Sequence, residues 1–347
     1  MPKTSQRQRQ QRTTLNQVAQ IAKVSKSTVS RVVNEDQSVA DETRARVLAA
    51  IEATGYRVNQ SARALVSNKT GAVAVAIYEH LATYFTSAFT GAMVTALQEY
   101  FFNKNLQVLI LPAPDAKRQE RIEKYIYDGH VDGAILLGPV HDDILLKDLL
   151  AASVPMVISG RPLSQQRVAF VDIDNVGASE SVIDAMVAAG REQIGFISGK
   201  LSNPAASDRL LGYRRSIEKA GLESSETLIG VGDWGYESAI VATQQILSAH
   251  PDLDAIFCSN DLMATAAMAV LKDIGKQVPE DVAVVGFDNS PTALRTNPAL
   301  TSVDQNPEEY AKALGEILLA QMSGEPRVES VILPTKIIWR ESFAKKK

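Results

Sequence analysis

Polar side chains follow three apolar runs of this chain, at points where a buried strand would end. Asp288 comes after VVGF, Asn260 comes after AIFCS, and Arg161 comes after VISG. The carboxyl ends of parallel strands meet at one edge of a sheet, so these side chains are expected to converge there. Carboxylate, amide and guanidinium groups together can hold a neutral, hydroxyl-rich ligand, because its hydroxyl oxygens and hydrogens both find partners.

Aromatic side chains in two further segments can supply flat apolar faces for a ligand ring. They are Trp234 in GDWGYES and the pair Tyr84 and Phe85 in ATYFTS. An arginine, an aspartate and an asparagine beside an aromatic platform suit a sugar, which is therefore the first choice of ligand.

A different chemistry is expected near the N-terminus, on a short helix that begins after Val24 with Ser25 as its N-cap. Its valines would face inward: Val29, Val32 and Val33. The outward residues are short hydroxyls and two bases, with no acid among them: Lys26, Ser27, Thr28, Ser30 and Arg31. Such a surface can enter a major groove, donate to phosphates and read base edges, so it predicts DNA binding.

Two neighbouring helices would position this surface. The first can be capped by Thr13 or Thr14, and its apolar face comprises Leu15, Val18, Ala19 and Ala22. The third lies within SVADETRARVLAAIEATGY, with Asp41 as its cap and Gly55 as its stop. Its inward residues would be Val47, Leu48 and Ile51. The first two helices predict a helix-turn-helix, and the third closes a small core.

The length of 347 residues exceeds one usual core, and 45% hydrophobic with 22% charged residues is typical of a globular protein, so two or three domains are expected. Residues 1–70 carry 12 lysines and arginines against 5 aspartates and glutamates, which leaves 24 against 35 for the rest. The basic end is expected to meet a polyanion. The basic N-terminus is followed by no apolar run of signal-peptide length, and no later stretch approaches eighteen uninterrupted apolar residues, which predicts a cytoplasmic protein. The single cysteine, Cys258, excludes an internal disulfide and is expected to be buried.

From Gly71 onward, short β-rich runs alternate with helical stretches. The runs include GAVAVAIYE, LQVLILPA, VDGAILLGP and PMVISG, then QIGFISG, LDAIFCSND and DVAVVGFDN. Continuous apolar runs of this length are typical of buried parallel strands. The helical stretches between them include TSAFTGAMVTALQEYFF and DLMATAAMAVLKDIG. The pattern predicts an α/β body of two doubly wound parallel sheets.

Signals for catalysis are weak. GVGDWG, residues 230–235, satisfies G-x-G-x-x-G, but the first strand of the body, where a dinucleotide fingerprint belongs, lacks it, and a tryptophan stands where pyrophosphate would approach. Four scattered histidines and one cysteine indicate no metal site, and no nucleophile motif such as G-x-S-x-G occurs. The chain is expected not to be an enzyme and to use no cofactor or metal.

Two segments of the head resemble one known family closely. VAQIAKVSKSTVSRVVN, followed by VADETRARVLAAIEATGYRVNQSARAL, is similar to the DNA-binding head of the LacI/GalR (lactose/galactose repressor) regulators of bacteria. The resemblance implies an all-α helix-turn-helix head for double-stranded operator DNA, with Lys26 and Ser27 in the variable positions that choose the operator. The implied DNA-binding residues are Thr14, Ser25, Lys26, Ser27, Thr28, Ser30, Arg31, Asn34, Tyr56, Asn59, Ala62, Arg63 and Leu65.

The segment NQSARAL, residues 59–65, matches a hinge helix that in this family folds when two copies pair in the DNA minor groove and a leucine wedges between base pairs. Leu65 matches the wedge. A segment of about seven residues is too short for a stable lone helix in water, and Ala62 and Leu65 form only a narrow apolar stripe. Asn59 can cap the helix, and Arg63 can reach minor-groove acceptors. Val58 replaces the family's usual proline, which indicates looser coupling.

The body resembles the effector domain of the same family and, more distantly, periplasmic sugar-binding proteins. Arg209, in ASDRLLGY, matches the family's effector arginine, whose planar fork can hold two neighbouring ligand oxygens. The implied effector-binding residues are Tyr84, Phe85, Arg161, Arg209, Trp234, Asn260 and Asp288. A purine is the second choice of effector. Purine-binding members have further groups that contact the ring in the loop before this arginine, whereas this chain has Asn203 and Ala205 at the matching positions.

The resemblance implies four segments: a basic disordered tail at 1–12, the helix-turn-helix domain at 13–58, the hinge helix and linker at 59–70, and an effector-binding and dimerisation domain at 71–343. Within the last, the N-subdomain would cover about 71–170 and 302–334, and the C-subdomain about 171–301 and 335–343. The chain ends without the leucine heptads that some members append, so homodimers are expected, not tetramers.

Together these features predict a dimeric, ligand-responsive transcription regulator at the bacterial nucleoid. It would repress carbohydrate-utilisation genes by binding a pseudo-palindromic operator, and a sugar in the cleft between the subdomains would release or modulate it. A transport sugar-binding protein would share the body but would need a signal peptide and has no use for residues 13–65. An NAD-dependent enzyme is the other alternative, which an absorbance assay for cofactor turnover would test.

Overall fold

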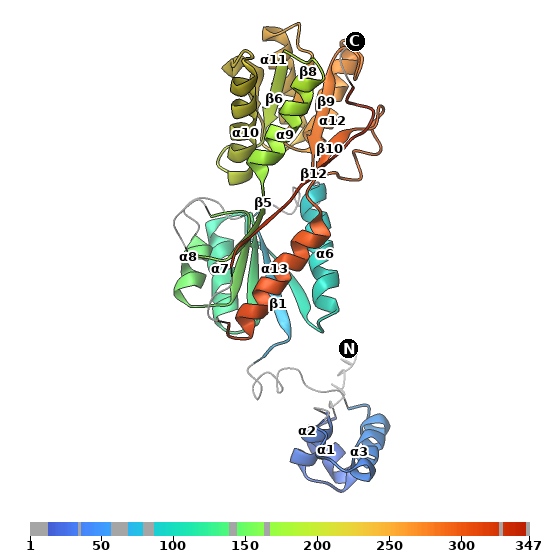
Figure 1. Cartoon of the computed structure of the whole chain (residues 1–347). Coiled ribbons are helices and arrows are strands. Elements are labelled where there is room, and N and C mark those ends of the chain that lie inside the picture. The colour runs from blue at the N-terminus through green and yellow to red at the C-terminus, as the bar shows by residue number, and fades with distance from the viewer. Residues whose placement is uncertain are drawn as a thin grey trace, which may run out of the picture. The chain divides into compact units, whose positions relative to one another are not determined.

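Figure 1 shows the computed structural model of the chain, which describes residues 13–33, 36–56, 69–78, 87–138, 144–162, 167–325 and 329–344, without the side chain of Ile144. The chain divides into two compact units, Met1–Thr70 and Gly71–Lys347. Within the described residues, no helix is both long and apolar enough to cross a membrane.

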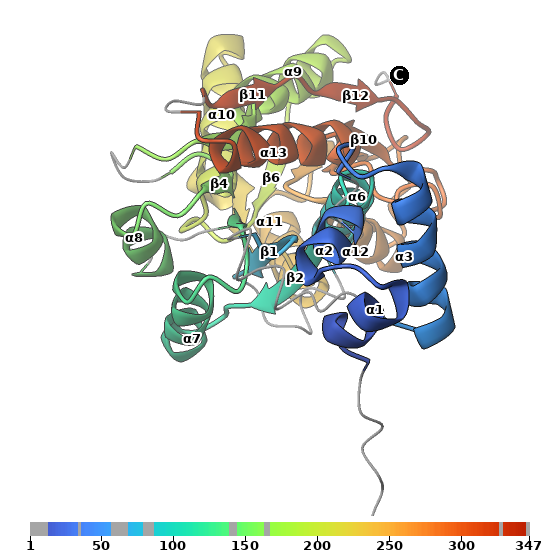
Figure 2. The same ribbon diagram turned by 90° about the horizontal axis from the view of Figure 1, so that it is seen from below.

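Three helices make up the described part of the first unit: α1 (Leu15–Ala22), α2 (Lys26–Val33) and α3 (Asp41–Thr54). Their apolar faces meet in one core (Figure 2), in which Val18, Val29 and Val47 are fully buried. The predicted three-helix head is confirmed.

Local sequence sets the ends of these helices. Lys23 adopts a left-handed conformation with φ 53°, and its N–H donates to carbonyls of α1, so the chain turns sharply into α2. The Oγ of Ser25 accepts from the N–H of Thr28 at 3.1 Å, which confirms the predicted N-cap. Gly55, with φ 60°, ends α3 as predicted.

Two details of α3 differ from the prediction. Leu48 was expected to face inward but is 52% exposed. The inward stripe runs through Val47 and Ala50, and Leu48 lies one residue, or about 100°, away from Val47 on the helix. Asp41 does not cap the helix, because Ala40 occupies the N-cap position and Asp41 is the first helical residue. At that position its carboxylate interacts favourably with the positive end of the helix dipole.

The first sheet of the second unit has the strand order β11-β5-β4-β3-β1-β2 and is parallel throughout. Its strands are β1 (Ala72–Ile77), β2 (Gln107–Pro112), β3 (Gly133–Leu137), β4 (Met156–Ser159), β5 (Phe170–Ile173) and β11 (Val331–Leu333). Alternate residues of β1 face opposite helical layers. Val73 and Val75 pack on the side of α6 (Ala88–Phe102) and α13 (Pro307–Met322), and Ala74 and Ala76 pack on the side of α7 (Ala116–Tyr127) and α8 (Ile144–Ala151). These elements form the first lobe.

The second sheet has the order β12-β10-β9-β8-β6-β7, and only β12 is antiparallel to its neighbour. Its strands are β6 (Ile194–Ser198), β7 (Ile229–Val231), β8 (Ala255–Cys258), β9 (Ala283–Phe287), β10 (Thr301–Asp304) and β12 (Lys336–Ile338). One face is covered by α9 (Asn175–Ala188) and α10 (Pro204–Ala220), and the other by α11 (Tyr236–Ala249) and α12 (Asp261–Asp273). A short 3-10 helix, η1 (Glu226–Leu228), precedes β7. These elements form the second lobe, in which Cys258 is buried as predicted.

The chain passes between the lobes three times. It crosses from β5 to α9, from β10 back to α13, and from β11 to β12. The crossings near 174 and 305 lie a few residues later than the subdomain limits that the sequence suggested near 170 and 302. The strands β5 and β10 each remain hydrogen-bonded in the sheet they leave until the crossing begins. The predicted fold class, a helical head and two doubly wound parallel sheets, is confirmed.

One buried arginine ties loops of the second lobe together. Arg191 is only 1% exposed, and its two terminal nitrogens donate to four backbone carbonyls, those of Asp254, Pro279, Asp281 and Ala344. Arg191→Met removes these donors, so it is expected to lower the free energy of unfolding by about 2 to 4 kcal/mol. Urea denaturation followed by circular dichroism measures this loss.

The matched control is Arg215→Met, which removes a half-exposed arginine of α10. Its Nη1 lies 3.7 Å from Glu180 Oε1, which is a long distance for an ion pair. An exposed pair of this kind contributes little, so the unfolding midpoint should hardly change. Equal midpoints for the two variants would show that the carbonyl contacts of Arg191 do not stabilise the lobe.

Candidate functional site

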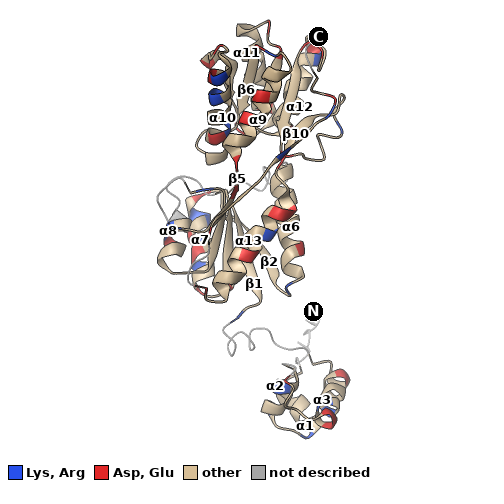
Figure 3. Cartoon of the chain, in the orientation of Figure 1, with Lys and Arg blue, Asp and Glu red and all other residues tan. Residues whose placement is uncertain are grey.

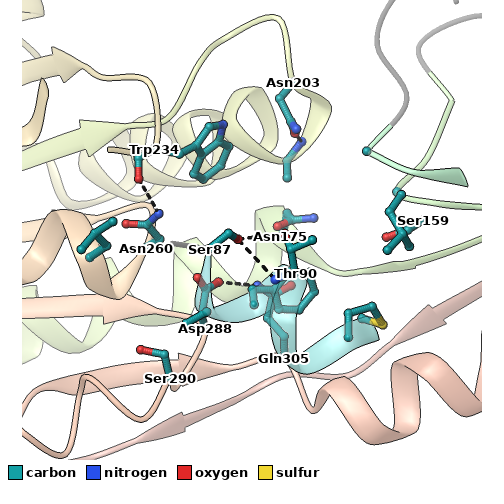
Figure 4. A pocket seen from close by; sticks show the side chains of 18 of the residues that line it. Ser87, Thr90, Ser159, Asn175, Asn203, Trp234, Asn260, Asp288, Ser290 and Gln305 are labelled. Carbon is teal, nitrogen blue, oxygen red and sulfur yellow. Dashed lines mark hydrogen bonds between the residues drawn. The ribbon is translucent and has the colours of Figure 1, made fainter. Parts of the chain in front are cut away.

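A cavity of about 350 Å³ lies between the two lobes, and this cavity is called the cleft below. It is lined by residues at the carboxyl ends of β1, β3, β4 and β9, by the starts of α6, α9, α10 and α12, and by the segment just before α11. Figure 4 shows side chains from both lobes pointing into it. The two sheets therefore present their carboxyl edges to the same space, as the strand-end argument required.

Arg209, on α10, forms the floor of the cleft. Its Nε donates to Asn175 Oδ1 at 2.9 Å and its Nη1 donates to the carbonyl of Ser259 at 2.5 Å. Its guanidinium carbon lies 3.5 Å from the ring centre of Phe287 and 5.7 Å from that of Trp234. Burial lowers the pKa of Arg209 to about 10, so the group stays charged at neutral pH. Nη2 makes no hydrogen bond to the described residues and remains available to a ligand.

Asp288 faces Arg209 from the end of β9. The chain leaves the strand with φ 103° at Asp288, and this turn directs the carboxylate into the cleft (Figure 4). Gln305, at a crossing between the lobes, donates to its Oδ1 at 2.5 Å. Burial raises the pKa of Asp288 to about 8, the positive charge of Arg209 acts against this rise, and the nearby Asp261 adds to it. The Oδ2 oxygen has no hydrogen-bond partner among the described residues.

Asp261, at the start of α12, was missed by the sequence analysis. One of its oxygens accepts from Ser302 Oγ at 2.5 Å and the other from the N–H of Ser290 at 2.6 Å. These bonds hold the loop after β9, which carries Asp288. Burial raises the pKa of Asp261 to about 6. Its place directly after Asn260 was the available signal, but a carboxylate in the first turn of a helix is also common without any site.

Asn260 and Trp234 form one unit at the side of the cleft. Asn260 Oδ1 caps α12 by accepting from the N–H of Met263 at 2.8 Å, and its Nδ2 donates to the carbonyl of Trp234 at 3.1 Å (Figure 4). The indole lies against Gly199, where a Cβ would approach the ring to 2.4 Å. Asn260 thus positions the aromatic platform, and Gly199 provides the space that the indole needs.

Arg161 lies at the rim, and its fork is occupied. Its Nε and Nη2 both donate to the carboxylate of Asp208, the Nε at 2.7 Å, and this hydrogen bonding raises the pKa of Arg161. Arg161 follows β4 of the first lobe, whereas Asp208 lies on α10 of the second, so the ion pair joins the lobes. The backbone N–H of Arg161 donates to Asp172 Oδ2 at 2.9 Å.

Four further cleft residues had no clear sequence signal: Asp172, Asn175, Gln305 and Tyr310. Asp172 and Asn175 flank the first crossing, and Asn175 Nδ2 donates to Asp172 Oδ1 at 3.1 Å. The hydroxyl of Tyr310 donates to the carbonyl of Val171 at 2.5 Å and accepts from the N–H of Gly160 at 3.1 Å. Burial raises the pKa of Asp172, and the hydrogen bonds that its carboxylate accepts from the N–H groups of Arg161 and Ile173 act against this rise.

In the head, the structure places the expected DNA-facing residues as the helical pattern indicated. Lys26, Ser27 and Arg31 are exposed on α2, while Val29 and Val32 are buried. Ser25 is exposed at the start of α2, and Thr28 and Ser30 are partly exposed. Figure 3 marks basic residues on α2 and residues of both charges on α3. The helix therefore presents bases and hydroxyls without a carboxylate.

Two other head residues were assigned to DNA binding. Thr14 is exposed, and its N–H donates to Gln17 Oε1 at 2.8 Å, while Tyr56 packs partly against the core. Seven of the predicted site residues lie outside the described residues: Asn34, Asn59, Ala62, Arg63, Leu65, Tyr84 and Phe85. Within the part of the chain that is described, no group of three histidine, cysteine or acidic side chains is placed to hold a metal ion.

The fold and the cleft together define a two-lobed ligand-binding body on a chain with a helix-turn-helix head. The family model for bacterial regulatory proteins of the lacI family matches residues 14–59, and that for a periplasmic binding protein-like domain matches residues 183–343. The HTH-type transcriptional regulator CelR of Thermobifida fusca is 37% identical over 96% of this chain and 99% of its own length. The chain belongs to the lacI family and is a DNA-binding transcription regulator.

Other relatives and solved structures agree with this family. Catabolite control protein A of Priestia megaterium is 31% identical over 95% of this chain and 98% of its own, and the repressor PurR of Photobacterium profundum is 30% identical over 89% and 92%. A transcriptional regulator CelR–cellobiose complex is 36% identical, covers 96% of this chain and 100% of that chain, and has a TM-score of 0.76. The Lac repressor dimer bound to operator and the anti-inducer ONPF shares the fold, with 24% identity, coverage of 96% and 99%, and a TM-score of 0.86.

Proposed function

We propose that this chain is a sugar-responsive repressor of carbohydrate-utilisation genes, whose effector binds in the cleft. The main support is the pairing of Arg209 Nη2 with Asp288 Oδ2. Both residues line the cleft, and neither atom has a hydrogen-bond partner among the described residues, so one can serve as a donor and the other as an acceptor. Vicinal hydroxyls can accept from the first and donate to the second. The similar regulator CelR has been solved as a complex with cellobiose.

A sugar is favoured over a purine, the second candidate, which the similarity to PurR supports. In the loop before Arg209, Asn203 Oδ1 is engaged in capping α10 through the N–H of Ala205 at 2.9 Å. Ala205 offers a methyl group where a purine would need a polar contact on its ring edge. The half-buried indole of Trp234 provides an apolar face of the kind on which a sugar ring rests.

The head is proposed to bind a pseudo-palindromic operator as part of a homodimer in the cytoplasm, where the nucleoid lies. Lys26 and Ser27 would meet base edges, and hydroxyl and basic neighbours on α2 would contact phosphates. Residues 59–65 would act as the paired hinge, with Leu65 as the wedge. The Arg161–Asp208 ion pair joins the lobes, so a sugar that changes their separation would act on this contact and through it on the hinges. No catalytic step or cofactor is proposed.

The proposed function is tested by a thermal-shift screen of sugars and nucleobases against the full chain, followed by operator binding with the positive ligands. A sugar that binds the folded state should raise the melting temperature and change operator affinity in the same preparation. Leu65→Ala should weaken operator binding about tenfold and leave the sugar shift intact, because the two sites are separate. If only a nucleobase raised the melting temperature, the effector would be a purine and not a sugar. If the protein bound no operator sequence selectively, the proposed function would be wrong.

A further inference from the structure

The charges around the cleft are unbalanced. Its lining contains two basic side chains, Arg161 and Arg209, and four acidic ones, Asp172, Asp233, Asp261 and Asp288. No lysine or histidine is among the described residues that line it. An anionic group on a ligand would therefore enter a space in which carboxyl groups outnumber basic side chains.

The two basic side chains are already committed to partners inside the protein. Arg161 holds the carboxylate of Asp208 with two of its nitrogens. Arg209 donates to Asn175 and to the carbonyl of Ser259, and it stacks on Phe287. Only one terminal nitrogen of each guanidinium is left without a hydrogen bond to the described residues. A phosphate needs several converging donors, and bidentate arginine contacts are the usual way to supply them.

The helix starts that face the cleft do not supply these donors either. The N-terminus of a helix binds anions through N–H groups that have no partner within the helix. Five helices begin at the cleft, and four of them have an N-cap side chain that accepts from a helix N–H. These acceptors are Ser87 for α6, Asp174 for α9, Asn203 for α10 and Asn260 for α12. The fifth helix, α11, begins after Gly235 without a side-chain cap, and the carboxylate of Asp233 lies beside its start, where it accepts from the N–H of Gly235 and the hydroxyl of Ser238. In α10 the residue after Asn203 is Pro204, which has no N–H at all.

The cleft instead contains hydrogen-bond acceptors that have no partner and need a donor from the ligand. Asp288 Oδ2 and Asp233 Oδ2 have no hydrogen-bond partner among the described residues, whereas the second oxygen of each carboxylate is engaged. A hydroxyl group brings the hydrogen that such an oxygen requires. A phosphate dianion or a carboxylate brings only further acceptors.

We infer that the cleft accepts uncharged sugars and rejects their phosphorylated and carboxylated forms. The inference rests on the proposed sugar response and specifies its ligand class. The rejection arises from the surplus of carboxyl groups and from the prior use of both guanidinium forks and of the helix starts. The hydrogen bond from Ser238 holds the pKa of Asp233 below its usual value, so this carboxylate is charged at neutral pH. A second negative charge placed beside it costs enough to reduce affinity about 100-fold or more.

Isothermal titration of the full chain tests this class with glucose, maltose and cellobiose, each beside its 6-phosphate, and with cellobiouronic acid. The uronic acid replaces a CH₂OH group by a carboxylate of nearly the same volume, so it separates charge from size. The neutral sugar that binds best should lose about 100-fold or more in affinity as its 6-phosphate. If cellobiose binds, the uronic acid should show a loss of the same order.

Asp233→Asn keeps an oxygen that can accept from the N–H of Gly235 and the hydroxyl of Ser238, and it removes one negative charge. It should therefore reduce the difference in affinity between the neutral and the phosphorylated sugar several-fold. Asp184→Asn, on the surface of α9 beside Lys219, is the matched control and should leave the difference unchanged. A sugar phosphate that binds as tightly as its neutral parent would overturn the inference but not the sugar response. So would tight binding of the uronic acid. If no sugar binds in any form, the proposed function fails and this inference fails with it.

Discussion

Arg209→Met should abolish the sugar response and weaken sugar binding by about 100-fold or more, while operator binding is retained. The variant removes Arg209 Nη2, which has no hydrogen bond to the described residues, and it also removes the positive charge that acts on Asp288. Without that charge, Asp288 holds its proton more firmly and accepts hydroxyl hydrogens less well. Titration calorimetry measures the loss in affinity, and a mobility-shift assay with and without sugar measures the loss in response.

Arg209 also supports the protein, because Asn175 and the Ser259 carbonyl lose a donor in the variant. Arg209→Lys therefore serves as a second variant, since it keeps the charge but loses the planar fork, and it should bind sugar with intermediate affinity. Arg214→Met is the matched control on the same helix. Its guanidinium pairs with the exposed Glu226 away from the cleft, so sugar binding should not change. A normal sugar response in folded Arg209→Met would exclude Arg209 from the effector site.

The sequence was sufficient to place much of the cleft because strand ends are a local signal. Asp288 and Asn260 each follow a run of apolar residues that forms a buried strand, and parallel strands bring such residues to a common edge. The same reasoning indicated Arg161, but it could not show that the guanidinium is held by Asp208. Asp208 lies 47 residues further along the chain, on the other lobe, and a contact over that separation leaves no local pattern.

The residues that were missed cluster where the chain crosses between lobes. Asp172 and Asn175 flank the first crossing and Gln305 the second, and the adjoining strands β5 and β10 are only four residues long. β4 and β8 are equally short and were recognised from their apolar runs, whereas β5 (FVDI) and β10 (TSVD) contain polar residues and form no continuous apolar run. Neither β5 and β10 nor the polar residues beside them were therefore recognised. These residues line the cleft only because the two lobes, each built on its own sheet, face each other there. The prediction for Leu48 was wrong for a different reason. Val47 and Leu48 are adjacent apolar residues of α3, and apolar character alone did not tell which of them faces the core.

The thermal stability of the ligand-free protein should fall as pH rises from about 5 towards 8, and Asp288 should account for much of this slope. Burial raises the pKa of Asp288 to about 8 in the folded protein from an ordinary value of 3.8. Between these values the folded protein binds a proton that the unfolded chain has released, so raising the pH favours unfolding. Asp261, with a pKa of about 6, contributes in the same direction over the lower part of the range.

Asp288→Asn should flatten the dependence of the melting temperature on pH above about 6, because the amide has no proton to release. Asp184→Asn should leave it unchanged in this range, since the hydrogen bond from Lys219 holds the pKa of Asp184 below its usual value. Differential scanning calorimetry from pH 5 to pH 8.5 provides the comparison. A wild-type slope that persists undiminished in Asp288→Asn would assign the buried proton to another group.

Sugar binding should show the opposite dependence. Hydroxyl groups that donate to Asp288, together with Arg209 beside it, stabilise the ionised carboxylate, so binding releases the proton that the empty cleft retains. Affinity should rise about 25-fold between pH 6.5 and pH 8.5 and level off above the pKa that Asp288 has in the free protein. Calorimetry in buffers of different ionisation enthalpy counts the released protons directly, and close to one per sugar is expected at pH 7. In Asp288→Asn both the proton release and the rise in affinity should disappear. If binding instead takes up a proton, Asp288 must be protonated in the complex and donate to an oxygen of the ligand. The proposed hydrogen bond, in which a sugar hydroxyl donates to Asp288, would then be wrong.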